Sequence, residues 1–266
     1  MTSERAQRTT LRLPVAGYEH HLLAAFGMIL FVALWEVLPA VGLINPFYTS
    51  SPSRIVMAAR QAARDRLWTD IAISSVEFWS GFLLAALVGI PLGVFLGWYR
   101  RWHALVDPLI TMFYTTPRVA LLPLLILWLG IGVASKVAVV FLGAVFPILM
   151  NVIAGVRTVD EALVTCARSF GAGDLKVFTT LALPASVPFT LTGLRIGVGR
   201  ALVGVVVGEM VAATGGIGHM ISVAGSAFQV DRVFVGVVII AAFGYAVTAI
   251  LNAVERRFDA WRPSQP

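Results

Sequence analysis

Six long runs of apolar residues constrain this chain more than any other feature of its sequence. A helix of about 20 residues crosses the roughly 30 Å hydrocarbon core of a bilayer. The runs cover, to within a few residues, 21–43, 78–98, 108–129, 137–156, 187–213 and 233–254. Each run predicts one membrane-spanning helix, so the chain is predicted to be an all-α membrane protein with six transmembrane helices.

The composition agrees with a membrane protein and argues against a soluble one. Only 13% of the 266 residues are charged and the mean hydropathy is +0.86, whereas about a quarter of the residues in a soluble domain are charged. The net charge of +6 is typical of membrane proteins, whose Lys and Arg residues hold loops in the cytoplasm. No basic stripe with interleaved aromatic residues indicates nucleic acid as a partner. The single cysteine, Cys166, excludes an internal disulfide and is interpreted as a small buried residue.

The distribution of Lys and Arg over the loops predicts the orientation, because these residues are enriched in cytoplasmic loops. With the N-terminus inside, eleven of them are cytoplasmic and six are external. We therefore expect both termini, and the loop after the fourth run, on the cytoplasmic side. The six external residues are Arg54, Arg60, Arg64, Arg66, Lys136 and Arg232.

Four of these external residues lie in one segment, SPSRIVMAARQAARDRLW, at residues 51–68. Its apolar side chains recur at helical spacing after a Ser-Pro start, which predicts an amphipathic helix on the outer surface with arginines toward headgroups or water. The first run has a signal peptide as its alternative interpretation. Because that run is long, contains Glu36 and lacks an obvious small-residue cleavage site, we expect it to remain attached.

Glycines and prolines inside three of the runs predict how those helices pack. Small residues spaced about four apart let helix backbones approach closely, within one subunit or at a dimer seam or moving gate, and we favour packing within one subunit. Prolines remove backbone donors, so the third run is expected to bend. The glycines are Gly89, Gly93 and Gly97 in the second run and Gly193, Gly197, Gly204 and Gly208 in the fifth; the prolines are Pro108, Pro117 and Pro123.

A polar segment at residues 158–185 separates the fourth run from the fifth. Asp160 can cap a helix, which the sequence GAG at 171–173 then breaks. A second short helix is predicted to begin at Asp174 and to stop before Pro184. We call this arrangement of helix, glycine turn and helix the polar hairpin, and expect it on the cytoplasmic face.

The polar hairpin resembles the cytoplasmic signature of the permease subunits of type I ABC importers. That signature reads Glu-Ala-Ala, three residues, Gly, nine residues, Ile, any residue and Leu-Pro. The spacing is met, although Thr165 and Cys166 replace the Glu and the first Ala. The matching positions are Ala167, Gly171, Leu181 in place of the Ile, Leu183 and Pro184.

Four ordered stretches narrow the resemblance to the nitrate, sulfonate and taurine branch of these permeases. They are LLPLLILWLGIGVASK, GVRTVDEALVTCARSFGA, LALPASVPFTLTGLRIGVGRA and VVVGEMVAATGGIGHMI. The resemblance implies the transmembrane domain of a type I ABC importer over about residues 68–256. Residues 1–67 would then hold the cytoplasmic N-terminus, the first span and the external amphipathic helix, and residues 257–266 a cytoplasmic tail. Glu77 departs from the branch, whose members usually carry a basic residue there.

The resemblance implies an inner-membrane permease subunit that imports a small anionic solute such as a sulfonate, taurine or nitrate. The implied partners are ABC ATPase subunits, which bind ATP and Mg²⁺, a periplasmic or lipid-anchored substrate-binding protein, membrane lipid, and a second copy of the chain in a homodimer. This chain has no phosphate-binding loop, so it is expected to be no enzyme and to bind no cofactor itself. A stand-alone secondary transporter is the alternative, because a bent span also fits that class.

In the family, the signature segment docks in a groove of the ATPase. Phe170 and Leu175 would be apolar anchors there, with charged residues at the rim setting the register. The alternative is an amphipathic loop that rests on lipid headgroups. The predicted contact residues are Ala167, Arg168, Ser169, Phe170, Gly171, Ala172, Asp174, Leu175, Lys176, Leu183 and Pro184.

Charged residues inside the apolar runs are candidates for the solute pathway. Arg118 and Arg200 fall near the middle of the third and fifth runs. Each charge there costs about 2.5–3.5 kcal/mol to insert into the membrane. Two such arginines would suit the passage of an anion. The alternative is structural, with such arginines, Arg195 included, pairing with carboxylates or snorkelling to the interface. Glu36 and Glu209 lie toward the outer ends of their runs. No metal site is expected, because the histidines lack the spacing of ligands.

Overall fold

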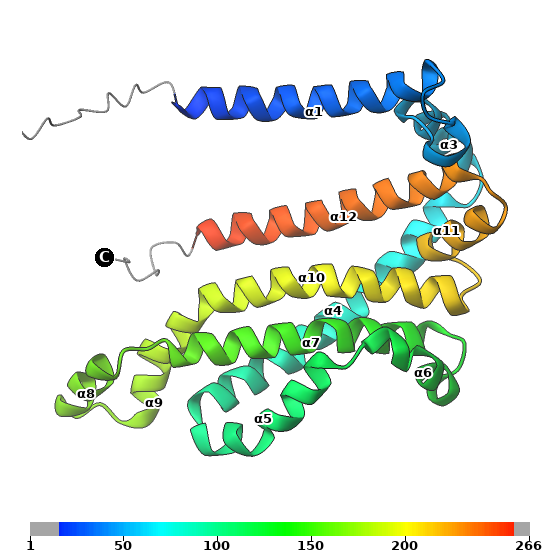
Figure 1. Cartoon of the computed structure of the whole chain (residues 1–266). Coiled ribbons are helices and arrows are strands. Elements are labelled where there is room, and N and C mark those ends of the chain that lie inside the picture. Colours follow the sequence, from blue (N-terminus) through cyan, green and yellow to red (C-terminus); the bar gives the residue numbers. More distant parts are fainter. Residues whose placement is uncertain (1–15, 258–266) are drawn as a thin grey trace, which may run out of the picture.

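The computed structural model describes residues 16–257, and all regular structure among them is helical, which confirms the predicted all-α fold. Of the basic residues used to predict the orientation, Arg5, Arg8, Arg12 and Arg262 lie outside the described residues. The elements in Figure 1 are α1 (Ala16–Ala40), α2 (Pro46–Thr49), α3 (Pro52–Arg64), α4 (Leu67–Trp98), α5 (Arg100–Thr115), the 3₁₀ turn η1 (Arg118–Leu121), α6 (Leu122–Leu129), α7 (Val133–Arg157), α8 (Glu161–Ser169), α9 (Asp174–Val177), the π-helix η2 (Phe178–Ala182), α10 (Leu183–Ala212), α11 (Ile217–Ser226) and α12 (Val230–Arg256).

Within the described residues, five helical segments are long and apolar enough to cross a membrane. They are α1, α4, α7, α12 and the continuous run of α9, η2 and α10. The count rises to six if α5 and the η1–α6 segment, which meet at 87°, form one broken span. The predicted bend is therefore confirmed. Pro117 lies at the break, where it cannot donate the backbone hydrogen bond that would continue α5.

The helices place the polar hairpin and the described ends of the chain at the same end of the molecule. In Figure 1, the start of α1, the end of α12, the α4–α5 turn and helices α8 and α9 lie at one end, and α3, α6 and α11 lie at the other. This arrangement agrees with the predicted orientation, in which both termini and the polar hairpin share one side of the membrane.

Helix α4 is longer than the second apolar run predicts, because it begins at Leu67 rather than near residue 78. Its first turns carry Asp70 and Glu77, which are both buried inside the protein. Since these polar side chains face other helices rather than lipid, they do not end the helix. A prediction from apolar length alone misses this part of α4.

Glycines bring α4 and α7 into close backbone contact. A Cβ atom at Gly93 would lie 2.7 Å from Cβ of Val152, and one at Gly97 would lie 2.6 Å from Cβ of Val156. Two further pairs keep the same sequence offset, which makes the helices parallel: Gly81 with Val140 and Gly89 with Ile148. Any larger residue at these positions of α4 would push the two helices apart.

Helix α10 packs against α7 in the same manner, but antiparallel. A Cβ atom at Gly193 would lie 2.9 Å from Cβ of Asn151, and one at Gly204 would lie 3.3 Å from Cα of Val140. Gly143 of α7 in turn faces the backbone of α10. The predicted burial of both glycine faces within one subunit is confirmed.

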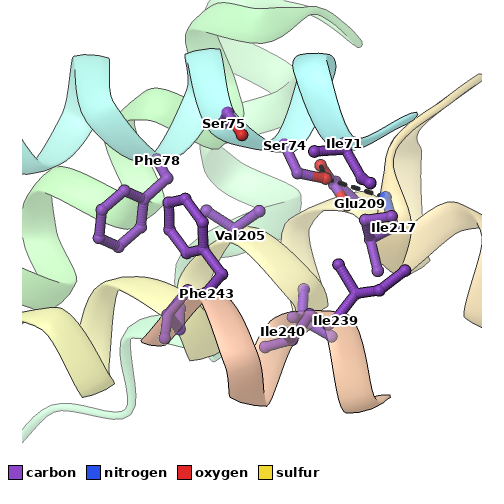
Figure 2. Close-up of a pocket in the computed structure, with 12 residues that line it drawn as sticks. Ile71, Ser74, Ser75, Phe78, Val205, Glu209, Ile217, Ile239, Ile240 and Phe243 are labelled. Carbon is purple, nitrogen blue, oxygen red and sulfur yellow. Dashed lines mark hydrogen bonds between the residues drawn. The ribbon is translucent and has the colours of Figure 1, made fainter. Parts of the chain in front are cut away.

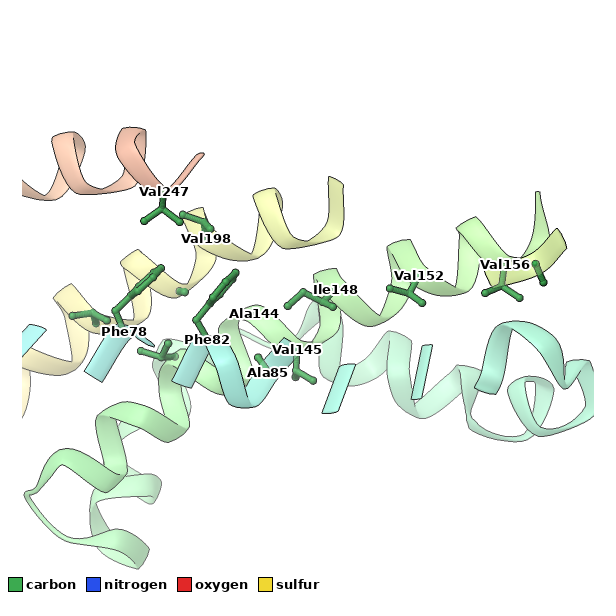
Figure 3. Packing of buried hydrophobic residues seen from close by; sticks show 14 residues of the cluster. Phe78, Phe82, Ala85, Ala144, Val145, Ile148, Val152, Val156, Val198 and Val247 are labelled. Carbon is green, nitrogen blue, oxygen red and sulfur yellow. The ribbon is translucent and has the colours of Figure 1, made fainter. Parts of the chain in front are cut away.

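The three helices enclose the main hydrophobic core, which Figure 3 shows. Phe78 and Phe82 of α4 stack at 5.4 Å between ring centroids, and Phe243 of α12 meets Phe78 edge-on at 5.0 Å. On the side of α7, Ile148 and Val152 are fully buried beside them. Val247 and Phe243 of α12 and Ala182 of η2 also belong to this cluster, so α4, α7 and α10 form its centre.

The second short helix of the polar hairpin does not stop before Pro184, and that prediction is wrong. Helix α9 continues through η2 into α10 without a break. Pro184 directly follows the wider π turn η2, a local distortion that is common where a proline interrupts the hydrogen bonds of a helix. The polar hairpin is therefore joined directly to a transmembrane helix.

Helix α3 is amphipathic, as predicted. Ile55, Ala58 and Ala62 are buried, and the helix packs against α12. Arg54 does not face headgroups or water alone, because its guanidinium pairs with Asp231 at the start of α12 at 3.0 Å. This ion pair fixes α3 across the outer end of the protein.

We predict that Gly93→Ala lowers the free energy of unfolding by about 1–3 kcal/mol, the cost of overpacking a well-packed core. Its matched control is Gly199→Ala on α10, where a Cβ atom meets nothing within 4 Å. Thermal unfolding in detergent should show a lower melting temperature for the first variant only. An unchanged melting temperature for Gly93→Ala would contradict the close approach of α4 and α7.

Candidate coupling hairpin and solute cavity

The first helix of the polar hairpin begins as its sequence predicts. Asp160 is the N-cap of α8, and its Oδ1 accepts a hydrogen bond from the Ala162 N–H at 2.8 Å. Glu161, in the first turn, pairs with Arg100 at the start of α5 at 2.8 Å. Both partners are largely exposed, so this pair orients α8 and adds little to stability.

The glycine turn of the polar hairpin is a Schellman motif. Gly171 has φ of +80°, the left-handed region that glycine adopts without strain. Its N–H donates to the Arg168 carbonyl at 2.9 Å, and the Ala172 N–H donates to the Ala167 carbonyl at 3.1 Å. Across the turn, Arg168 also pairs with Asp174 of α9 at 2.8 Å. The turn is thus closed by its own hydrogen bonds and needs no packing against the body.

Two large apolar side chains stand out from the polar hairpin. Phe170 is 89% exposed and Leu175 is 76% exposed. Burying such a side chain in a partner contributes about 1.5–3 kcal/mol. The structure brings the other predicted contact residues of 167–176 onto the same protrusion, with Arg168, Ser169, Gly171, Asp174 and Lys176 exposed and Ala167 and Ala172 half-buried; Leu183 and Pro184 lie further along, in the first turn of α10.

The two positions that depart from the family signature carry no acidic group. The Thr165 hydroxyl donates to the Glu161 carbonyl of its own helix at 2.8 Å. Cys166 is exposed, so its interpretation as a buried residue is wrong. The reason is that α8 projects from the end of the bundle (Figure 1) and buries little of its surface.

The base of the polar hairpin, in contrast, is firmly packed. Val177 at the end of α9 and Ala182 at the end of η2 are fully buried. The ring of Phe178 meets Trp98 of α4 at 5.2 Å in a T-shaped contact. An exposed tip on a buried base makes the polar hairpin a rigid projection.

The two candidate pathway arginines line one cavity of about 340 Å³. Arg118 lies on η1, at the break between α5 and α6, and Arg200 lies on α10. The wall between them includes Tyr114 and Thr116 of the broken segment and the backbone at Gly143. Among the described residues that line the cavity there is no carboxylate.

Arg118 is held in place by contacts that leave its charge uncompensated. Its Nη2 donates to the Tyr114 carbonyl at 2.6 Å, and its guanidinium lies 5.4 Å from the Tyr114 ring and 5.8 Å from the Phe146 ring. Its Nε is buried and has no hydrogen-bond partner among the described residues. None of the ion pairs of the described chain includes Arg118 or Arg200.

Arg195, one turn from Arg200, has the structural role that was the alternative for these arginines. Its guanidinium pairs with Glu255 of α12. This ion pair joins α10 to α12 toward the end of the molecule that carries the polar hairpin.

The sequence did not predict a second polar cluster, in the half of the core away from the polar hairpin. Lys136 of α7, which was counted as a loop residue, is buried and pairs with Glu77 of α4 at 2.8 Å. Glu209 of α10 is fully buried and accepts a hydrogen bond from Ser74 of α4 at 2.6 Å, as Figure 2 shows. The spacing of Asp70, Ser74 and Glu77 in the sequence could have predicted this cluster, because it places three polar side chains on one face of α4.

Comparisons with known proteins agree with this architecture. Residues 89–260 match the sequence model of the binding-protein-dependent transport system inner membrane component. The chain is 32% identical to the taurine transport system permease protein TauC of Escherichia coli (strain K12), over 86% of each chain. It is also 32% identical to the putative aliphatic sulfonates transport permease protein SsuC of Bacillus subtilis (strain 168), over 88% of this chain and 85% of that one.

A solved structure shares the fold. An inward-facing structure of the MetNI methionine ABC transporter aligns with a TM-score of 0.64 and 17% identity, over 72% of this chain and 95% of that one. The family match includes both the polar hairpin and the arginine cavity. The chain therefore belongs to the binding-protein-dependent transport system inner membrane components, the permease subunits of ABC importers.

Proposed function

We propose that this permease imports a small organic anion of the sulfonate class across the inner membrane, and that a separate ATPase drives it through the polar hairpin. The observation that carries the substrate class is the cavity with Arg118 and Arg200 and no carboxylate among its described lining residues. The names of the similar permeases, for taurine and aliphatic sulfonates, support the same class.

The chemistry of the cavity suits a sulfonate. Two guanidinium groups that face one space repel each other, and an anion between them removes that repulsion. The sulfonate group offers three oxygens to the planar N–H donors of arginine. The volume of about 340 Å³ is within the range of small-molecule sites, roughly 300–1,000 Å³.

The polar hairpin suits a coupling role. Phe170 and Leu175 offer apolar anchors with charged neighbours, the arrangement of a small, specific docking surface. The ATPase, with its ATP and Mg²⁺, would bind this tip on the cytoplasmic side. Since the base of the polar hairpin is packed against α4 and continuous with α10, movement of the tip displaces transmembrane helices.

The complete transporter in this proposal is a homodimer with two ATPase subunits and a substrate-binding protein outside the membrane. Residues 68–256 form the transporter domain in each copy. Helix α1 contacts little of its own chain, in agreement with a segment that precedes this domain. The binding protein delivers the anion to the end of the molecule that carries α3, α6 and α11.

We predict that Gly171→Asp abolishes binding of the ATPase while the permease still inserts into the membrane. The substitution forces a side chain into the left-handed region at φ of +80° and opens the Schellman turn. Co-purification of the ATPase with the tagged permease, at matched permease levels in the membrane fraction, measures the effect.

The matched control for this variant is Gly173→Asp. It adds the same charge two residues away, at the N-cap of α9, where φ is −71° and Asp is favourable. It should retain the ATPase. Normal co-purification with Gly171→Asp would refute the coupling role of the polar hairpin.

We predict that Arg118→Met and Arg200→Met each lower uptake of a labelled alkylsulfonate or taurine by about tenfold or more, because a hydrogen bond to a charged group contributes about 1.5–3 kcal/mol. Binding of the ATPase should not change, since neither residue lies on the polar hairpin: Arg118 is on η1 and Arg200 is in the second half of α10. Initial uptake rates in cells, normalised to permease level, measure the effect.

Arg60→Met is the control for the loss of a positive charge. Arg60 is exposed on α3, at the outer end, and forms no ion pair among the described residues. Uptake by this variant should stay near the wild-type rate. If both cavity variants also import sulfonates at the wild-type rate, the cavity is not the anion pathway.

A further inference from the structure

The short external helix α11 is held at its N-terminus by side chains of two transmembrane helices. The Gly216 N–H donates to Asp70 at 2.9 Å, the Ile217 N–H to Ser74 at 2.9 Å and the Gly218 N–H to Glu209 at 2.6 Å. Asp70 and Ser74 belong to α4, and Glu209 belongs to α10. Three consecutive N–H groups, which a helix leaves without partners at its start, are thus all satisfied from outside α11.

The glycines before and inside α11 permit this close approach. Gly216 has φ of +105°, and a Cβ atom there would collide with the Glu209 carboxylate. A Cβ atom at Gly218 would collide with the Val206 carbonyl of α10. The sequence TGGIG therefore fits around the Glu209 carboxylate. This contact explains the glycines of a segment that belongs neither to the arginine cavity nor to the polar hairpin.

Glu209 is the centre of this arrangement. Its side chain is fully buried, and its second oxygen accepts the Ser74 hydroxyl at 2.6 Å (Figure 2). A carboxylate at a helix N-terminus is stabilised by the helix dipole and by the N–H groups that point at it. One side chain of α10 thus bonds to both α4 and α11, and we call this junction the outer lock.

The outer lock lies at the far end of the helix that begins in the polar hairpin. Helices α9 and α10 and the π turn between them form one continuous run, Asp174–Ala212. From Asp174 to Glu209 the run spans roughly 50 Å, at a rise of about 1.5 Å per residue. The run is a continuous helical connection between the polar hairpin and Glu209.

Beyond the outer lock, the packing leaves a small void. A cavity of about 40 Å³ lies between the locked helices and α12, which contributes Ile239, Ile240 and Phe243 to its lining (Figure 2). On this side α12 meets α4 and α10 only through apolar side chains among the residues that line the cavity. The apolar contact sets no direction, whereas the hydrogen bonds of the outer lock fix distance and direction. Helix α12 is joined to α10 elsewhere, by the Arg195–Glu255 ion pair, and it packs on α11 at Gly236.

We propose that Glu209 is a positioning residue that makes α11 move as one body with α4 and α10, so that the polar hairpin controls the external end of the transporter. This inference rests on the proposed coupling role of the polar hairpin. It assigns to Glu209 no contact with the solute.

The test is Glu209→Gln in the complete transporter, with the ATPase and binding protein, reconstituted in liposomes. Glutamine keeps the size of the side chain but turns an NH₂ group toward the Gly218 N–H or the Ser74 hydroxyl, both of which are donors here. We expect normal assembly and normal basal ATP hydrolysis. The stimulation of hydrolysis by loaded binding protein should fall about tenfold, within the range of typical coupling free energies.

Glu36→Gln is the matched control. Glu36 of α1 also accepts a backbone N–H, at 3.0 Å, and a serine hydroxyl, at 2.6 Å, both from Ser53 at the start of α3. It lies at the same end of the molecule but on a helix outside the run from the polar hairpin. Stimulation should stay at the wild-type level in this variant. Equal losses in Glu36→Gln and Glu209→Gln would overturn the inference.

A distance measurement separates positioning from a general loss of stability. Spin labels at Trp68 of α4 and Val223 of α11, both exposed, in a Cys166→Ser background, report on the outer lock. In complexes in which only one copy of the permease carries the labels, the wild-type protein should give one distance with and without ATP and vanadate, and Glu209→Gln should give a broader distribution. An identical distribution in Glu209→Gln would refute the lock.

Two further outcomes are distinguishable. If Glu209→Gln fails to assemble, Ser74→Ala takes its place, because it removes one donor to Glu209 and one acceptor of α11, and it should show the same broadening with a smaller loss of stimulation. If wild-type transporter imports no sulfonate, the proposed substrate class fails. The spin-label distances of the permease and ATPase complex still decide the outer lock.

Discussion

Close contact between the backbones of α4, α7 and α10 is the constraint on which the rest of the structure depends. Lipid gives no hydrophobic force that drives helices together, so dispersion contacts at small residues must do so. A Cβ atom added to these glycines of α4 and α10 would meet Val, Ile and backbone atoms of α7 at or below ordinary van der Waals distance. The three helices therefore form one rigid unit, which positions the polar hairpin, the arginine cavity and α11.

The same tight core explains how this membrane protein can bury charge. Glu77 and Lys136 form an ion pair between α4 and α7, and Glu209 accepts hydrogen bonds from Ser74 of α4 and from the Gly218 N–H of α11. Such groups are costly in a bilayer unless they are satisfied inside the protein. Arg118 and Arg200 differ from them because they face a cavity without a carboxylate among its described lining residues. The structural charges Glu77, Lys136 and Arg195 form ion pairs, whereas Arg118 and Arg200 of the candidate solute site form none among the described residues.

Much of this could be predicted from the sequence, because the bilayer restricts what an apolar run can become. The helical fold, the glycine faces, the bend at Pro117 and the turn at Gly171 each follow from local rules. The errors share a different cause. Lys136 and the first turns of α4 are polar by sequence but buried by tertiary contacts, whereas Cys166 is small but exposed because α8 projects from the bundle. The end of the second short helix was misplaced because a π turn precedes Pro184 and the helical run continues past the proline.

The π turn η2, between α9 and α10, has a consequence for how such a protein can change over evolution. A π turn corresponds to one extra residue in an α-helix, in which each residue advances the chain by about 100°. The polar hairpin and the face of α10 that lines the arginine cavity are therefore set at an angle that neither α9 nor α10 fixes alone. A single insertion or deletion in η2 would rotate the polar hairpin relative to the cavity-lining face of α10 and leave both intact. The relative orientation of the two surfaces could therefore change during evolution without a change in either one.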